Sequence, residues 1–190
     1  NTTLLLQNPS QVDPADPNVT APDDTGSYAI TSLSINFFAD EREQVDYLFV
    51  YDQDSVADDV GQMTSQVFGA GDDAVRKGRI TGLGMGPDTF IGGTLQPGGV
   101  TYGDLEAVQV NLGSGNDTLL VDYTTISTDH TTERDEPFYT LTMVNTGEGD
   151  DTVTVNLTEG EDGAFSLNTQ GGDDTVYGQG STLPLVVFGW

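Results

Sequence analysis

The sequence of 190 residues contains no cysteine, one histidine, one tryptophan and only five basic residues. The absence of cysteine excludes a disulfide framework and any thiolate metal site. The only histidine, His130, lies in a polar stretch, and a catalytic base needs an orienting partner within reach. No apolar run approaches the roughly 18 residues of a membrane-spanning helix. Membrane-spanning proteins and histidine- or thiol-based enzymes are therefore poor descriptions of this chain.

Acidic residues dominate the charge, with 31 of them and a formal net charge of −26. A field of this sign repels nucleic acid and anionic lipid and attracts cations. Eight of the acidic residues are glutamates, so 31 − 8 leaves 23 aspartates. Short carboxylates suit tight turns and metal sites built from oxygen ligands. We therefore favour cation binding over its alternative, a general adaptation of the surface to high salt.

Changes in composition divide the chain into three parts. Residues 1–26 are rich in proline, aspartate and threonine and read as an extended linker or strap. Residues 27–100 read as a β-rich segment, in which Val45–Tyr51 is the most strand-like run. This segment also holds three cations, Arg76, Lys77 and Arg79, which we expect to pair with acidic neighbours. Residues 101–190 are repetitive.

The repeat consists of three segments that align without gaps. Each has a short strand, an asparagine, a Gly-rich turn, Asp-Thr and a second strand; the segments are Val108–Val121, Thr142–Val155 and Phe165–Gly178. The spacing between the first and second segments is longer than that between the second and third. It includes the polar segment Thr124–Pro137, which reads as an inserted loop. A weaker fourth copy is expected at 69–75. Periods of this length are typical of stacked repeats, in which equivalent residues form columns.

Stacking predicts specific columns of side chains. They comprise two inward apolar columns, a threonine column and an asparagine ladder: Leu119, Val153 and Val176; Val110, Val144 and Leu167; Thr118, Thr152 and Thr175; Asn111, Asn145 and Asn168. We accordingly predict an all-β chain with a right-handed parallel β-solenoid, or β-helix with β-roll-like turns, at 101–190. The segment 27–100 would either join this solenoid or cap it.

The turns resemble a known calcium-binding motif. Gly113–Leu119, Gly147–Val153 and Gly171–Val176 are similar to the Gly-Asp nonapeptide of RTX, or haemolysin-type, proteins. The resemblance implies Ca²⁺ as cofactor, with Asp117, Asp151 and Asp174 as principal ligands and Asp150 and Asp173 as additional ones. The motifs occur singly and the third copy has Gln170 in place of a glycine, so we expect partial sites at coil edges.

A second resemblance covers about residues 46–121. Segments such as 81–86 and 100–106, leading into NLGSGNDTLLV, are similar to units of giant surface proteins of bacteria and some algae. This resemblance implies a module of an extracellular or cell-surface adhesin or fibre. The favoured function is thus structural and not enzymatic, with calcium stiffening the module. The alternatives are a module that binds carbohydrate or a partner protein, and a polysaccharide-cleaving β-helix enzyme.

Two further features concern partners. The apolar run Leu185–Trp190 has no polar cap, so we expect it to be covered by further copies of the repeat or by a neighbouring subunit in a polymer. Glycosylation sequons occur at Asn1, Asn18, Asn116 and Asn156. A glycan on Asn116 would compete with an ion in the same turn.

Overall fold

The computed structural model describes residues 45–127 and 138–189. The chain divides into two units, residues 1–41 and 42–190, and the described residues belong to the second. The predicted linker at 1–26, residues 27–44 of the predicted β-rich segment, and His130 lie outside the described residues. In the described part, no helix has the length and hydropathy of a membrane span.

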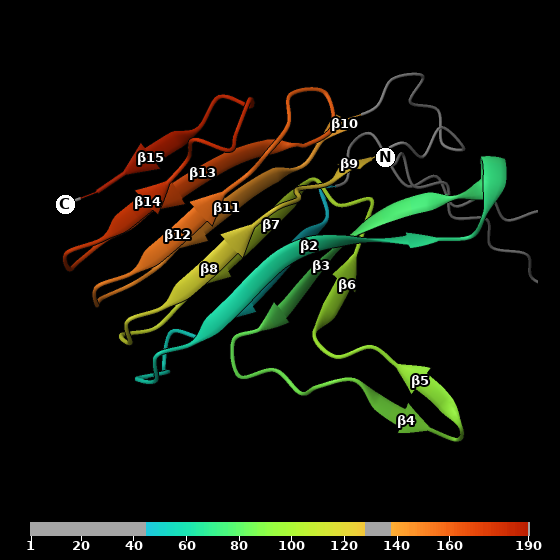
Figure 1. The fold of residues 1–190 in the computed structure, drawn as a ribbon, viewed down its shortest axis with the longest axis horizontal. Coiled ribbons are helices and arrows are strands. Elements are labelled where there is room, and N and C mark those ends of the chain that lie inside the picture. Colours follow the sequence, from blue (N-terminus) through green and yellow to red (C-terminus); the bar gives the residue numbers. More distant parts are fainter. Residues whose placement is uncertain (1–44, 128–137, 190) are drawn as a thin grey trace, which may run out of the picture. The chain divides into compact units, whose positions relative to one another are not determined.

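The first sheet contains five strands, and every neighbouring pair in it is parallel (Figure 1). In spatial order the strands are β1 (Tyr47–Tyr51), β7 (Ala107–Asn111), β11 (Leu141–Asn145), β13 (Ala164–Asn168) and β15 (Val186–Phe188). Their β-branched and aliphatic side chains alternate between the two faces of the sheet. Val110, Val144 and Leu167 are buried on the inward face.

The second sheet contains six strands and is mixed. In spatial order the strands are β14 (Thr175–Tyr177), β12 (Thr152–Val155), β8 (Thr118–Val121), β2 (Val60–Phe68), β3 (Val75–Gly82) and β6 (Val100–Tyr102). The first four are parallel neighbours, seen side by side in Figure 1. The pairs β2–β3 and β3–β6 are antiparallel. Two short antiparallel ribbons complete the described strands: β4 (Thr89–Ile91) with β5 (Thr94–Gln96), and β9 (Ile126–Ser127) with β10 (Phe138–Tyr139).

The prediction of a single right-handed parallel β-solenoid is wrong, because the six-stranded sheet is mixed and two further ribbons are antiparallel. Strand β2 is nine residues long, and the Gly-rich turn after it reverses the chain, so that β3 returns antiparallel along β2. This turn contains a short 3-10 helix, Gly71–Asp73, and is the segment 69–75 that was expected to be a fourth repeat copy. The described residues are nevertheless all-β apart from that helical turn.

The predicted columns are confirmed by the strand registers. Val153 pairs with Leu119 on one side and with Val176 on the other. Val144 likewise pairs with Val110 and Leu167. The threonine and asparagine columns have the same registers. The repeat alignment therefore gives the correct neighbour for each strand of the three copies.

Inward side chains of both sheets form one hydrophobic core. It includes Val108, Val110, Val144 and Leu167 from the first sheet and Met63, Ile80, Leu119, Val121, Val153 and Val155 from the second. Each fully buried aliphatic side chain of this kind contributes roughly 1.5–3 kcal/mol relative to an exposed one. We call one strand of the first sheet, the following turn and the next strand in the second sheet a coil. Since every coil contributes only a few such residues, stability depends on keeping the strands in register.

Candidate functional site

The turns between the two sheets hold the predicted metal ligands. Six residues join β7 to β8 (112–117), β11 to β12 (146–151) and β13 to β14 (169–174). Each turn ends on two consecutive residues with short carboxylate or amide side chains, and the second of the two is always aspartate. Because the flanking strands pair in register, these residues stack above one another from coil to coil.

A further copy of the turn was missed by sequence reasoning. Strands β1 and β2 pair in register with β7 and β8, and the eight residues between them (52–59) end on Asp58 and Asp59. This turn is two residues longer than the other three, so the segment does not align with the repeat without a gap. The apolar position of the second strand is Gly61, and a Cβ there would lie 2.5 Å from Leu83 Cδ2, so Leu83 fills the space. The Asp-Asp pair before Val60 was the available clue.

The stacked residues form two hydrogen-bonded ladders, in which a side-chain oxygen accepts the backbone N–H of the equivalent residue one coil earlier or later. We name them the inner ladder, Asp59, Asp117, Asp151 and Asp174, and the outer ladder, Asp58, Asn116, Asp150 and Asp173. In the inner ladder the N–H groups donate to the Oδ1 atom of the next aspartate at 2.8, 2.8 and 3.0 Å. In the outer ladder the N–H groups donate to the Oδ1 atom of the preceding member at 2.8, 2.8 and 2.9 Å.

The ladders differ in their exposure to solvent. Asp117 and Asp151 of the inner ladder are buried, and Asp174 is half-buried. Asp150 and Asp173 of the outer ladder are exposed. Burial raises the pKa of Asp117 and of Asp151, and neighbouring carboxylates raise it further, while the donated backbone N–H groups lower it. The inner ladder is therefore a row of closely spaced carboxylates with little solvent.

The five predicted calcium ligands are thus divided between the ladders. Asp117, Asp151 and Asp174 belong to the inner one, and Asp150 and Asp173 to the outer one. Carboxylate oxygens are suitable ligands for calcium. Within residues 45–127 and 138–189, however, no group of three or more His, Cys, Asp or Glu side chains converges closely enough to hold a metal ion. Asp151 Oδ2 is buried and has no hydrogen-bond partner among the described residues.

We expect Asp151→Ala to destabilise the fold because the substitution leaves the N–H of Asp117 buried without its acceptor. The cost of such a group is about 1–3 kcal/mol. Asp151→Asn retains the acceptor oxygen and removes the charge, so it should be at least as stable as the parent at neutral pH. Denaturant unfolding of both variants measures the difference. Equal destabilisation by Ala and Asn would contradict the ladder.

Because of the raised pKa values, the difference in stability between the parent and Asp151→Asn should also depend on pH. A carboxyl whose pKa is higher in the folded than in the unfolded chain binds its proton first in the folded state. Stability should therefore rise as the pH falls from neutral through the raised pKa values of Asp117 and Asp151 towards 3.8, the ordinary value. Asp151→Asn should show a smaller rise. A parent protein that loses stability steadily over this range would oppose the argument.

One sequon asparagine is built into the outer ladder. Asn116 Oδ1 accepts the N–H of Asp150, and its own N–H donates to Asp58. Asn156 is exposed, and its side-chain amide donates to Asp122 at 2.8 Å. Asn1 and Asn18 lie outside the described residues.

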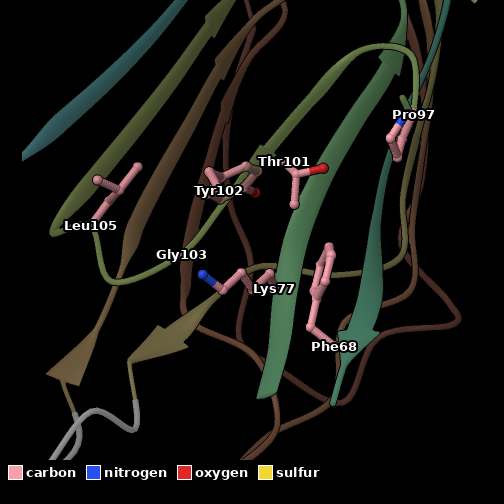
Figure 2. Close-up of a pocket in the computed structure, with 7 residues that line it drawn as sticks. All are labelled: Phe68, Lys77, Pro97, Thr101, Tyr102, Gly103 and Leu105. Carbon is pink, nitrogen blue, oxygen red and sulfur yellow. The ribbon is translucent and has the colours of Figure 1, made fainter. Parts of the chain in front are cut away.

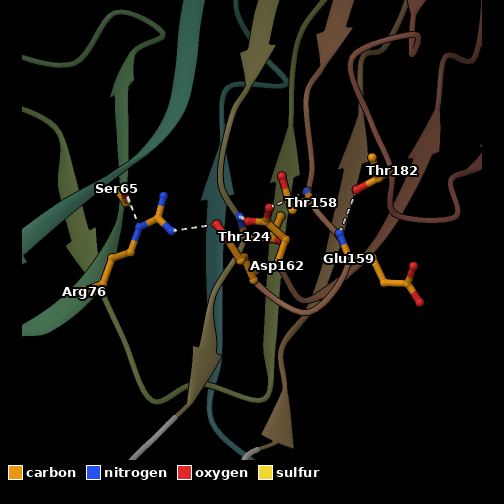
Figure 3. Close-up of polar contacts among 8 residues, drawn as sticks. Ser65, Arg76, Thr124, Thr158, Glu159, Asp162 and Thr182 are labelled. Carbon is orange, nitrogen blue, oxygen red and sulfur yellow. Dashed lines mark hydrogen bonds and ion pairs between the residues drawn. The ribbon is translucent and has the colours of Figure 1, made fainter.

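A buried aspartate outside the ladders organises the loop that follows β12. Asp162 accepts the backbone N–H groups of Thr124 and Thr158 at 2.8 and 2.7 Å (Figure 3). Burial raises the pKa of Asp162, while these donors and the Arg76 guanidinium lower it. Both carboxylate oxygens of Asp162 accept hydrogen bonds from backbone N–H groups. This geometry indicates a residue that holds the loop in place and not a catalytic acid.

Among the described residues, two of the three cations of β3 pair with acidic side chains, as predicted. The Arg76 guanidinium lies 4.1 Å from the centre of the Tyr123 ring and 3.9 Å from Glu161. Its Nε donates a hydrogen bond to Ser65 (Figure 3). Arg79 lies 3.3 Å from Asp88. The Arg76 contacts attach the β2–β3 hairpin to the loop after β12.

A separate cavity of about 720 Å³ lies beside the antiparallel part of the second sheet. Figure 2 shows its lining residues, Phe68, Lys77, Pro97, Thr101, Tyr102, Gly103 and Leu105. It is largely open to solvent, unlike the enclosed sites that bury most of a small molecule. None of the predicted ligands and no acidic side chain lines it, so it is independent of the two ladders.

Comparison with known proteins returns no relative: no protein-family model, no curated protein and no solved structure matches this chain.

Proposed function

We propose that the chain is a structural repeat module of a large extracellular surface protein, adhesin or fibre, stiffened by calcium at its Gly-Asp turns. The observation that carries the proposal is the inner ladder, in which three hydrogen bonds, each accepted by an aspartate Oδ1 atom, join four successive coils. Repeated residues that bind or act on a small-molecule substrate would be expected to point into a common cavity. These residues instead join one coil to the next.

The edges of the sheets are consistent with a partner of the same kind. Val186, Val187 and Phe188 of β15 are 49%, 45% and 56% exposed, and β15 pairs within the described residues only with β13. An exposed apolar edge strand favours pairing with another strand. Further copies of the repeat, or a neighbouring subunit, therefore remain the proposed partners.

The calcium component is tested by thermal unfolding. Stacked carboxylates repel one another, and a cation that binds only the folded state stabilises it, by about 2.7 kcal/mol at one hundred times its dissociation constant. We expect the unfolding midpoint in millimolar calcium to exceed that in chelator by several degrees. Sodium chloride at matched ionic strength is the control for general screening.

The two components of the proposal, calcium binding and the structural role, can be disproved separately. An unchanged midpoint would mean that the ladder carboxylates serve stacking alone, which removes calcium and keeps the structural module. Single-molecule stretching of the chain between inert handles then tests the module itself. A structural unit should resist extension and unfold in one cooperative step. Gradual extension at low force would remove the structural role.

A further inference from the structure

The outward face of the five-stranded sheet is free of charge. Its residues form three rows across the strands: Tyr47, Ala107, Leu141 and Ala164; Phe49, Gln109, Met143, Ser166 and Val186; Tyr51, Asn111, Asn145, Asn168 and Phe188. No acidic or basic residue occurs in any row, although the chain carries 31 acidic side chains. We call this surface the neutral face.

Large apolar side chains on the neutral face are exposed. Tyr47, Phe49 and Tyr51 are 57%, 46% and 64% exposed, and Phe188 at the opposite edge is 56% exposed. The rings on β1 lie in near-parallel planes, with centroids 5.7 Å apart from Tyr47 to Phe49 and again from Phe49 to Tyr51. Exposed aromatic side chains gathered in this way mark a surface that contacts something else.

The third row combines aromatic ends with an amide centre. From β1 to β15 it reads Tyr51, Asn111, Asn145, Asn168 and Phe188. Four spacings between strands separate its ends, or about 19 Å at roughly 4.8 Å for each. The row therefore has aromatic ends and a polar centre, over the length of a short oligosaccharide.

Hydrogen bonding within this row is incomplete. Asn111 Oδ1 accepts hydrogen bonds from the side-chain amides of Gln109 and Asn145, at 2.9 and 2.7 Å. Asn111 Nδ2 and Asn168 Oδ1, in contrast, are buried and have no partner within residues 45–127 and 138–189. Unsatisfied buried polar atoms are rare in folded proteins and call for a missing partner. A small rotation of half-buried Asn168 would let a ligand hydroxyl supply it.

We infer that the neutral face binds a neutral glycan chain, which lies across the strands along the third row. The aromatic ends offer apolar contact to sugar rings, and the half-buried amides of Asn145 and Asn168 offer hydrogen bonds to hydroxyls. The charge of the chain argues against charged ligands. A net charge of −26 repels anionic glycans, whereas a cationic ligand would favour the acidic turns. This inference does not depend on the calcium or the structural proposal.

Affinity electrophoresis in native gels tests the inference, since the acidic full-length chain migrates readily. Galactomannan and a soluble β-glucan are the neutral probes, and alginate is the anionic control. We expect retardation by at least one neutral polysaccharide and none by alginate. Tyr51→Ala and Phe188→Ala should each weaken the apparent affinity about tenfold, since one aromatic contact contributes roughly that factor.

Two variants separate binding from stability. Tyr177→Ala is the matched control, because Tyr177 is 46% exposed on the end strand of the other sheet, and its affinity should be unchanged. Asn168→Ala should weaken binding with no loss in the unfolding midpoint, since Oδ1 of Asn168 accepts no hydrogen bond in the part of the chain that the structure describes. If Asn168→Ala lowers the midpoint and leaves binding intact, the amides serve stacking only and the inference fails.

The remaining outcomes also overturn the inference. The inference fails if neither neutral polysaccharide slows migration of the parent protein. It also fails if Tyr177→Ala loses as much affinity as Tyr51→Ala and Phe188→Ala. Sedimentation provides the last comparison. If the chain self-associates, if Tyr51→Ala abolishes the association and if no glycan retards the parent, then the neutral face is an interface between copies.

Discussion

Val153→Asp is expected to prevent cooperative folding. Val153 is 1% exposed and lies in the central column of the core, between Leu119 and Val176. A carboxylate at this position has no cation or solvent within the apolar cluster, so it must remain charged at high cost or fold only when protonated. The loss should exceed about 4 kcal/mol, which is beyond the range of ordinary surface substitutions. Circular dichroism and denaturant unfolding measure it.

Thr154→Asp is the matched control for that substitution. Thr154 is the next residue along β12, so its side chain points to the opposite face of the sheet, and it is only half-buried. It pairs with Leu120 and Tyr177, neither of which is charged. We expect the Thr154→Asp protein to fold. If both variants folded equally well, the inward and outward assignment along β12 would be incorrect.

The alternation along β12 was predictable because repetition supplies information that a single strand lacks. The residue pattern of a single strand predicts only which side chains lie on each of its two faces. Three aligned copies also predict which strands are its neighbours in the sheet. Alignment of Asn111, Asn145 and Asn168 was sufficient to give the registers of six strands. Local propensity alone would not have distinguished these parallel pairs from hairpins.

The antiparallel part could not be predicted in the same way, because it is not repeated. Strand β2 begins as a member of the parallel stack and continues beyond it to Phe68. The Gly-Asp turn that follows has the composition of the repeat but joins two strands of one hairpin. Composition marks a turn in both cases, whereas the direction of the next strand depends on tertiary contacts such as Arg76 over Tyr123.

The aspartates illustrate a limit on predicting a site from spacing. Their recurrence correctly predicted that they stack, and the resemblance implied that they bind calcium. In the structure their Oδ1 atoms accept backbone N–H groups. The same spacing is therefore expected for a metal site and for a side-chain ladder, and only the orientation of the carboxylates distinguishes the two.

The third turn shows how strongly the stack determines backbone conformation. Gln170 adopts φ +61, in the left-handed region, at the position where the second copy has Gly147 with φ +96. A side chain in that region costs roughly 1–2 kcal/mol. The turn accepts this strain because the strands on both sides are held in register by their neighbours.

Gly149→Ala should be far more harmful than the strain at Gln170, because it adds a collision between coils. Gly149 has φ +120, and a Cβ on it would lie 2.2 Å from the carbonyl oxygen of Gly115 in the adjacent turn. That oxygen belongs to the backbone, so relief requires the two coils to separate and the ladders to break. We expect a loss of about 4 kcal/mol or more, from backbone strain and overpacking together. Gly160→Ala is the control, since Gly160 has φ +82 but no atom within 4 Å of its added Cβ, and it should cost only about 1–2 kcal/mol. Equal unfolding midpoints for the two variants would show that the turns are not in contact.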